Sequence, residues 1–299
     1  MPPLKSLTGQ SKLAFRESSK ARPRVWNLRA RCFFTGLGVT ALSVPSCEQP
    51  LPVCVSGRGD FAALYQPISA SDPAGPCAGI IGEVLGMNTY NYPSTGEGTG
   101  DWKRGRVAMQ GARMGARVAR QERSDPQWTD PDPSHRAYAL GDFSSGEPGP
   151  DDFCRLGSVA DAVQNFPLAS KTGTDEEAPA TTLTYKWKNT AFYVTTAALG
   201  TQMVAELEYV KDNCTATYQV WALAPDRDCE RIDKDGQGKW NARSGEPDPR
   251  RCLPLADPDN GIADVSGVNP DLPVECKSFA ADGKSDFHCV LTAPPPALK

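Results

Sequence analysis

Residues 181–223 read TTLTYKWKNTAFYVTTAALGTQMVAELEYVKDNCTATYQVWAL and carry the strongest secondary-structure pattern of the chain. Large apolar side chains such as Tyr185 and Trp187 alternate there with threonine and lysine. A period of two with many aromatic and β-branched residues is typical of half-buried antiparallel strands. Gly200-Thr201 and Asp212-Asn213 have turn chemistry. The stretch therefore predicts three or four strands of one antiparallel sheet.

A sheet with one apolar face needs a second layer to bury that face. The chain also holds 27 glycines and 27 prolines in 299 residues, which shorten regular elements and favour turns. We therefore predict a mainly β protein, an antiparallel β-sandwich with one short helix and disulfide-held loops. Segments 124–150 and 171–182 are rich in Asp, Pro, Ser, Thr or Gly and are predicted to be exposed loops.

The helix is predicted over residues 101–123, with Asp101 as its cap. Its defining feature is a basic face, because the following side chains fall at helical spacing: Arg106, Gln110, Arg113, Arg117 and Arg120. Such a face binds either an anionic ligand or acidic groups of its own chain. Exposed arginines favour the first alternative, and arginines covered by acidic side chains favour the second.

The N-terminal 46 residues have the order of regions that is typical of an export signal. Eight Lys or Arg against one Glu precede an apolar run from Cys32 to Val44, and Pro45-Ser46-Cys47 follows. The segment Leu42-Ser43-Val44-Pro45-Ser46-Cys47 resembles the lipobox of bacterial lipoprotein precursors, although Pro45 stands where that family usually has Ala, Ser, Thr or Val. The resemblance implies that Cys47 carries a lipid and becomes the mature N-terminus. The alternatives are export without a lipid, or a cytoplasmic protein in which Cys32 to Val44 is a buried strand or short helix.

These features divide the chain into a signal peptide (1–46), a tether (47–76) and a β-rich disulfide-bonded domain (77–299). The loop at 171–182 is a candidate boundary between two subdomains. The expected location is the bacterial cell envelope, at the outer membrane or the periplasmic face, with secretion as the alternative.

Ten cysteines support an oxidising compartment. With Cys32 removed in the signal and Cys47 lipidated, an even set of eight remains. The predicted disulfide partners are Cys54, Cys77, Cys154, Cys214, Cys229, Cys252, Cys276 and Cys289. Their connectivity stays open, although nearness in sequence suggests Cys54 with Cys77 and Cys214 with Cys229. No Cys-x-x-Cys pair is present, which argues against zinc.

The net charge of the chain limits the classes of molecule that it is expected to bind. The leader contributes +7 to a chain total of −4, which leaves −11 for residues 32–299. An acidic surface disfavours nucleic acid, so the membrane, reached through the lipid, and an envelope protein or glycan are the expected partners. The one cofactor candidate is calcium, for which Asp257, Asp259 and Asp264 form an Asp-rich loop with a Gly turn.

No motif specifies catalysis. Only His135 and His288 are present, and neither has a motif partner. We therefore predict a non-catalytic envelope lipoprotein that binds a ligand or serves a structural role. The alternative is a carboxylate-based hydrolase of extracellular polysaccharide, which needs two carboxylates in a cleft. A glycan binder is expected to expose several Trp or Tyr rings.

Overall fold

The computed structural model describes residues 52–94, 100–128, 136–281, 283 and 285–297. The strands are β1 (Gly59–Ala70), β2 (Gly82–Pro93), β3 (Gly100–Gly111), β4 (Ala139–Phe143), β5 (Phe153–Ala160), β6 (Ala162–Phe166), β7 (Thr181–Val194), β8 (Leu199–Lys211), β9 (Cys214–Leu223), β10 (Glu230–Lys234), β11 (Trp240–Pro247), β12 (Val274–Ser278) and β13 (Phe287–Leu291). The α-helix of this part is α1 (Ala112–Ser124), and two short 3-10 helices are η1 (Pro249–Cys252) and η2 (Pro258–Asn260). The mainly β, antiparallel prediction with one α-helix is confirmed.

The first nine strands form one antiparallel sheet in the order β5-β4-β3-β2-β1-β9-β8-β7-β6. The sheet closes on itself because β5 also pairs with β7, with Phe153 opposite Tyr193 and Arg155 opposite Ala191. β6 continues the line of β5 along β7. The second layer that the apolar faces require is thus supplied by the far side of the same sheet.

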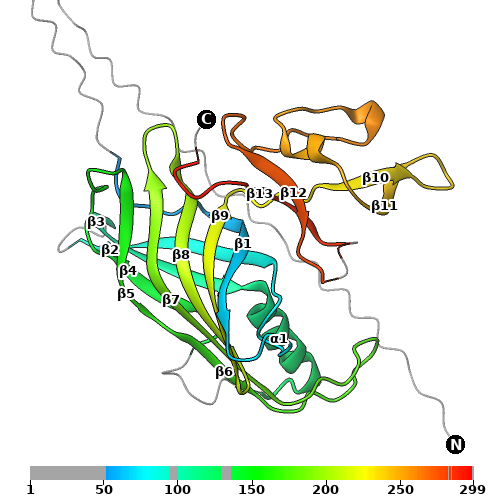
Figure 1. Cartoon of the computed structure of the whole chain (residues 1–299), viewed down its shortest axis with the longest axis horizontal. Coiled ribbons are helices and arrows are strands. Elements are labelled where there is room, and N and C mark those ends of the chain that lie inside the picture. The colour runs from blue at the N-terminus through cyan, green and yellow to red at the C-terminus, as the bar shows by residue number, and fades with distance from the viewer. Residues whose placement is uncertain (1–51, 95–99, 129–135, 282, 284, 298–299) are drawn as a thin grey trace, which may run out of the picture. The chain divides into compact units, whose positions relative to one another are not determined.

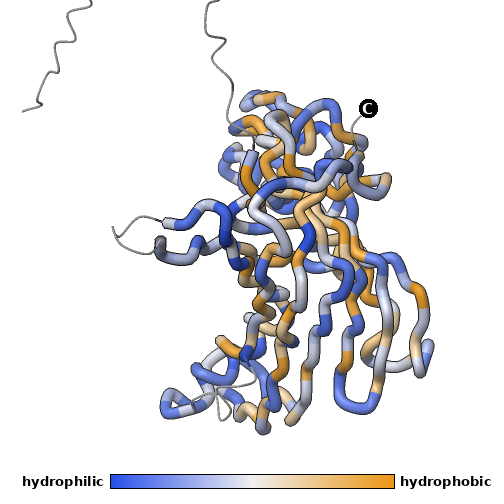
Figure 2. Tube along the Cα trace, turned by 90° about the vertical axis from the view of Figure 1, so that its left-hand side faces the viewer, coloured by the Kyte–Doolittle hydropathy of each residue, from blue (hydrophilic) through white to orange (hydrophobic). Residues whose placement is uncertain are grey.

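Strand alternation fills the inside of the closed sheet. Phe61, Leu85, Val107, Tyr185 and Leu207 point inward and are at most 1% exposed, and they belong to the main hydrophobic cluster. Figure 2 shows this alternation as orange and blue stretches along the strands. The region 181–223 forms β7, β8 and β9 as predicted. The first turn lies at 195–198 instead of at Gly200-Thr201, and Gly200 enters β8 with a φ of +69°.

The predicted helix over 101–123 is wrong in its first half. Residues 100–111 form β3, whose inward side chains Val107 and Met109 lie opposite Thr89 and Met87 of β2. An arginine spacing that fits a helix also fits part of a strand, and burial of Val107 and Met109 decides in favour of the strand. The helix begins at Ala112 after Gly111, so Asp101 is not its cap.

The tether predicted at 47–76 also needs correction, because Gly59–Ala70 is β1, hydrogen-bonded between β2 and β9. Its alternation is masked by Pro67 and by burial on both faces. The proposed boundary at 171–182 connects β6 to β7 within the same sheet and divides no subdomains. The signal peptide, Cys32 and Cys47 lie outside the described residues.

Residues beyond β9 build two small hairpins, β10-β11 and β12-β13. Phe279 and Val290 pack against Ala62 and Leu64, the outward residues of β1. Figure 1 shows β12 and β13 beside β1 and β9. This explains why β1 is buried on both faces.

Four disulfides join Cys54 to Cys154, Cys77 to Cys214, Cys229 to Cys276 and Cys252 to Cys289. Neither pairing suggested by nearness in sequence is formed. The first two bonds connect distant parts of the closed sheet, and the last two stabilise the C-terminal hairpins. Among the described residues, no helix is long and apolar enough to cross a bilayer.

Candidate functional site

A hollow lies on the outer face of β1 to β5. It consists of two adjoining pockets of about 520 Å³ and about 370 Å³ that share Arg136, Tyr138 and Leu140. We call these two pockets the outer groove. Its other polar or aromatic lining residues are Asp60, Asn88, Tyr90, Arg106, Gln110, Asp142, Ser158 and Asp161.

Strand register explains why this face is hollow. Directly opposed residues of antiparallel strands share a face. Asn88, Ala108 and Leu140 form one such outward row, and Leu140 is also opposite Ala160. The small side chains of Gly86, Ala108 and Ala160 make the floor low, whereas long side chains rise around it.

Two tyrosines line the larger pocket. Tyr90 is 55% exposed and Tyr138 is 37% exposed. The Arg136 guanidinium carbon lies 5.7 Å from the Tyr138 ring centre. The Gln110 side-chain amide donates to the carbonyl of Ala137 at 3.0 Å, which fixes the chain entering β4. The groove thus combines accessible ring faces with amide and charged groups.

The smaller pocket contains a hydrogen-bonded group of charged side chains. The Arg106 guanidinium donates two hydrogen bonds to the Asp142 carboxylate, at 2.6 and 3.0 Å, and the Tyr92 hydroxyl donates a third at 3.0 Å. The Arg106 guanidinium lies above the Tyr92 ring, 5.1 Å from its centre. The hydrogen bond from Arg106 and its charge lower the pKa of Asp142. A general acid of a hydrolase needs a raised pKa, so this carboxylate does not support the hydrolase alternative.

The strands that form the outer groove are similar in sequence to a known protein family. The model of the MlpA family matches residues 59–225, from the start of β1 to just beyond β9. The chain belongs to the MlpA family. A Myxococcus xanthus protein named "Putative lipoprotein MlpA" is 27% identical over 258 residues, which cover 84% of this chain and 90% of that protein. No solved structure matches the chain.

The MlpA region therefore coincides with the closed sheet and contains the whole outer groove. Sequence reasoning missed Tyr90, Tyr138 and Arg136. Tyr138 and Arg136 lie just before the short strand β4, inside the segment predicted as a loop. The sequence signal there was the short apolar run Tyr138-Ala139-Leu140, which is too short to distinguish a strand from a loop.

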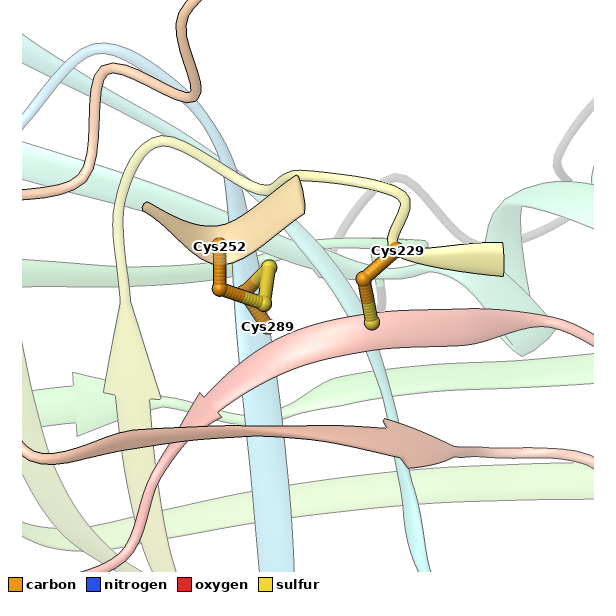
Figure 3. A group of neighbouring side chains, drawn as sticks. All are labelled: Cys229, Cys252 and Cys289. Atoms are coloured by element: carbon orange, nitrogen blue, oxygen red, sulfur yellow. A yellow bond between two sulfur atoms is a disulfide. The ribbon is translucent and has the colours of Figure 1, made fainter. Parts of the chain in front are cut away.

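The predicted calcium ligands do not converge among the residues that the structure describes. Asp257 accepts a hydrogen bond of 2.7 Å from the Asn260 side chain, and Asp264 lies 3.4 Å from the Arg227 guanidinium. The one group of three acids, histidines or cysteines close enough to share a metal there is Cys229, Cys252 and Cys289. Figure 3 shows the Cys252–Cys289 bond beside Cys229, whose sulfur is bonded to Cys276. Sulfurs in disulfides are not thiolate ligands, so this cluster is structural.

Two tryptophans and the arginines of α1 lie in different surroundings. Trp187 is buried beside Tyr185, with ring centres 6.4 Å apart, whereas Trp102 is 64% exposed on β3. Arg113, Arg117 and Arg120 remain on one face of α1 and bind their own chain. Arg117 donates to carbonyls of Pro167, Ala178 and Pro179, and Arg120 to those of Ser170 and Glu176.

Proposed function

We propose that this protein is a lipid-anchored, non-catalytic binding protein of the bacterial envelope, and that its outer groove holds a glycan. The anchor is supported by the lipobox-like segment ending at Cys47 and by a family relative named a lipoprotein. The disulfides add support, because all eight cysteines beyond Cys47 pair with one another and such bonds persist in oxidising compartments.

The glycan assignment rests on one observation, the exposed rings of Tyr90 and Tyr138 at a polar groove. Sugar rings have apolar C–H faces that pack on aromatic rings, and their hydroxyls need donors and acceptors nearby. Asn88, Gln110 and Asp60 offer such groups in the same pocket. A pocket of this volume falls within the range of small-molecule sites.

The anchor is tested by the intact mass of the membrane-extracted protein before and after reduction. The expected mass corresponds to a chain that starts at Cys47 and carries diacylglycerol, and reduction of four disulfides should add eight hydrogens. A chain that retains residues 1–46 contradicts the anchor.

The groove is tested by titrating purified protein with soluble peptidoglycan fragments and with polysaccharide released from the producing bacterium's envelope. We expect Tyr90→Ala with Tyr138→Ala to weaken binding of one of these probes about tenfold or more. Trp102→Ala is the matched control, because Trp102 is exposed on the same hairpin but does not line the groove. Equal losses in both variants, or no binding of either probe, contradict the glycan assignment.

A further inference from the structure

A further pocket lies at one end of the closed sheet, between α1, the start of β7 and the end of β8. It encloses about 410 Å³, and its lining includes four cations, namely Arg113, Arg117 and Arg120 of α1 and Lys211 of β8. No acidic residue lines it. Leu183 and Tyr209 supply apolar surface on the opposite wall. We call this the basic pocket.

The cations meet there because helix and strand periodicities converge. Arg113, Arg117 and Arg120 share a face of α1. Lys211 lies opposite Leu183 in the β7–β8 register, and Leu183 belongs to the inner cluster, so Lys211 is on the inner side of the sheet. Figure 1 shows α1 at the end of the sheet where β6 lies. The arrangement is specific to the tertiary fold and does not follow from the arginine spacing alone.

The positive charge of the basic pocket is only partly balanced by the chain itself. Arg113 lies 3.6 Å from Glu83, and Arg120 lies 3.7 Å from Asp175, which also binds Arg123 at 2.7 Å. Within the part of the chain that the structure describes, Arg117 and Lys211 form no ion pair. The carbonyls that bind Arg117 satisfy donors without carrying a formal negative charge.

Two further observations agree with this imbalance. Arg120 is 8% exposed, and its Nη1 and the Nε of Arg117 are buried without a hydrogen-bond partner among the described residues. Burial, and then the nearby charge of Arg120, lower the pKa of Arg117. Like charges held together in an otherwise acidic protein cost free energy that an anion would recover.

We propose that the basic pocket binds the oxyanion of a small amphipathic molecule, with its apolar part against Leu183 and Tyr209. Arginine suits this task because its planar fork matches the oxygens of a phosphate or carboxylate. The pocket is distinct from the outer groove, which lies on the opposite face of the sheet, so this proposal stands independently of the glycan assignment.

The test titrates the full chain in detergent, by calorimetry, with three probes. Phenyl phosphate carries charge and a ring, inorganic phosphate carries charge alone, and phenol carries a ring alone. Phenyl phosphate should bind most tightly, and its affinity should fall with added salt. Lys211→Gln should weaken phenyl phosphate binding about tenfold while leaving the unfolding midpoint close to that of the parent protein.

The matched control is Lys188→Gln on β7, because Lys188 pairs with Glu208 and does not line the pocket. Its affinity for phenyl phosphate should equal that of the parent protein. A second variant, Arg117→Gln, should also weaken binding, with its stability measured in parallel because Arg117 holds residues 167–179. Absence of phenyl phosphate binding, equal effects of Lys211→Gln and Lys188→Gln, or equal affinities for phenyl phosphate and inorganic phosphate would overturn the proposal.

Discussion

The carboxylate of Glu83 accepts a hydrogen bond of 2.9 Å from the backbone N–H of Arg113, at the start of α1. Glu83 lies on β2 and points into the closed sheet, where it is 4% exposed. It also accepts hydrogen bonds from the hydroxyls of Tyr65 at 2.7 Å and Tyr185 at 3.4 Å. Glu83 of β2 therefore caps the N-terminus of α1, because the N-cap residue of α1 makes no side-chain hydrogen bond.

Replacing Glu83 should destabilise the protein more than replacing a surface acid. Glu83→Leu removes the acceptor for a buried hydroxyl and the partner of Arg113, so we expect the free energy of unfolding to fall by about 3 kcal/mol. Glu83→Gln keeps the acceptor and should cost roughly half as much. Urea unfolding with disulfides intact measures both. Glu208→Gln, at a pair of exposed lysines, is the control and should cost less than about 1 kcal/mol; a Glu83→Leu loss no larger than that contradicts the capping role.

Gly111, which precedes α1, should tolerate no side chain. A Cβ there would lie 2.8 Å from an oxygen of the immobilised Glu83 carboxylate. Gly111→Ala should therefore lower the unfolding free energy by about 1–3 kcal/mol. Gly115→Ala, within the same helix, meets only the flexible end of Gln110 at 3.2 Å and should be neutral or stabilising by up to about 1 kcal/mol. Thermal unfolding of the two variants compares them, and the reverse order would refute this explanation.

His288 should make stability depend on pH. Burial opposes its charge, but hydrogen bonds and the charges of Asp226 at 2.7 Å and Asp286 at 2.9 Å outweigh burial and raise its pKa above 6.5. Because the pKa of the folded state is the higher one, the stabilisation is fully present below the unfolded value and is lost as pH rises through the folded value. The parent protein should therefore be more stable than His288→Gln at low pH, and this difference should shrink as the pH rises from about 5.5 to about 9, a range that spans the pKa of histidine. A difference that stays constant or grows with pH argues against this assignment.

The neighbouring disulfides should exchange when one is opened. The sulfurs of Cys229, Cys252 and Cys289 lie within 4.8 Å of one another. Cys276→Ser leaves Cys229 as a thiol beside the Cys252–Cys289 bond, so peptide mapping without reduction should find Cys229 joined to Cys252 or Cys289 in part of the protein. The control is Cys229→Ser with Cys276→Ser, in which the Cys252–Cys289 bond should be the sole bond of this hairpin region. Recovery of only the Cys252–Cys289 bond from Cys276→Ser would contradict the expected exchange.

The mainly β class, the strands of residues 181–223 and the number of disulfides can be predicted from the amino-acid sequence. These follow from local alternation and from a count of cysteines, which need no knowledge of distant contacts. The extent of the helix, the disulfide connectivity and the binding sites depend on contacts between distant residues. The arginine spacing at 106–120 fits a helix throughout, but burial of Val107 and Met109 against neighbouring strands makes its first part β3.

The two candidate binding sites are among the features that depend on contacts between distant residues. The outer groove depends on the register that places Gly86, Ala108 and Ala160 between tall side chains of other strands. The basic pocket needs the closure of the sheet to bring Lys211 toward Arg117, and the disulfides join cysteines up to 137 residues apart. Local propensity cannot encode such meetings, because they arise only when strand pairing fixes which distant residues become neighbours.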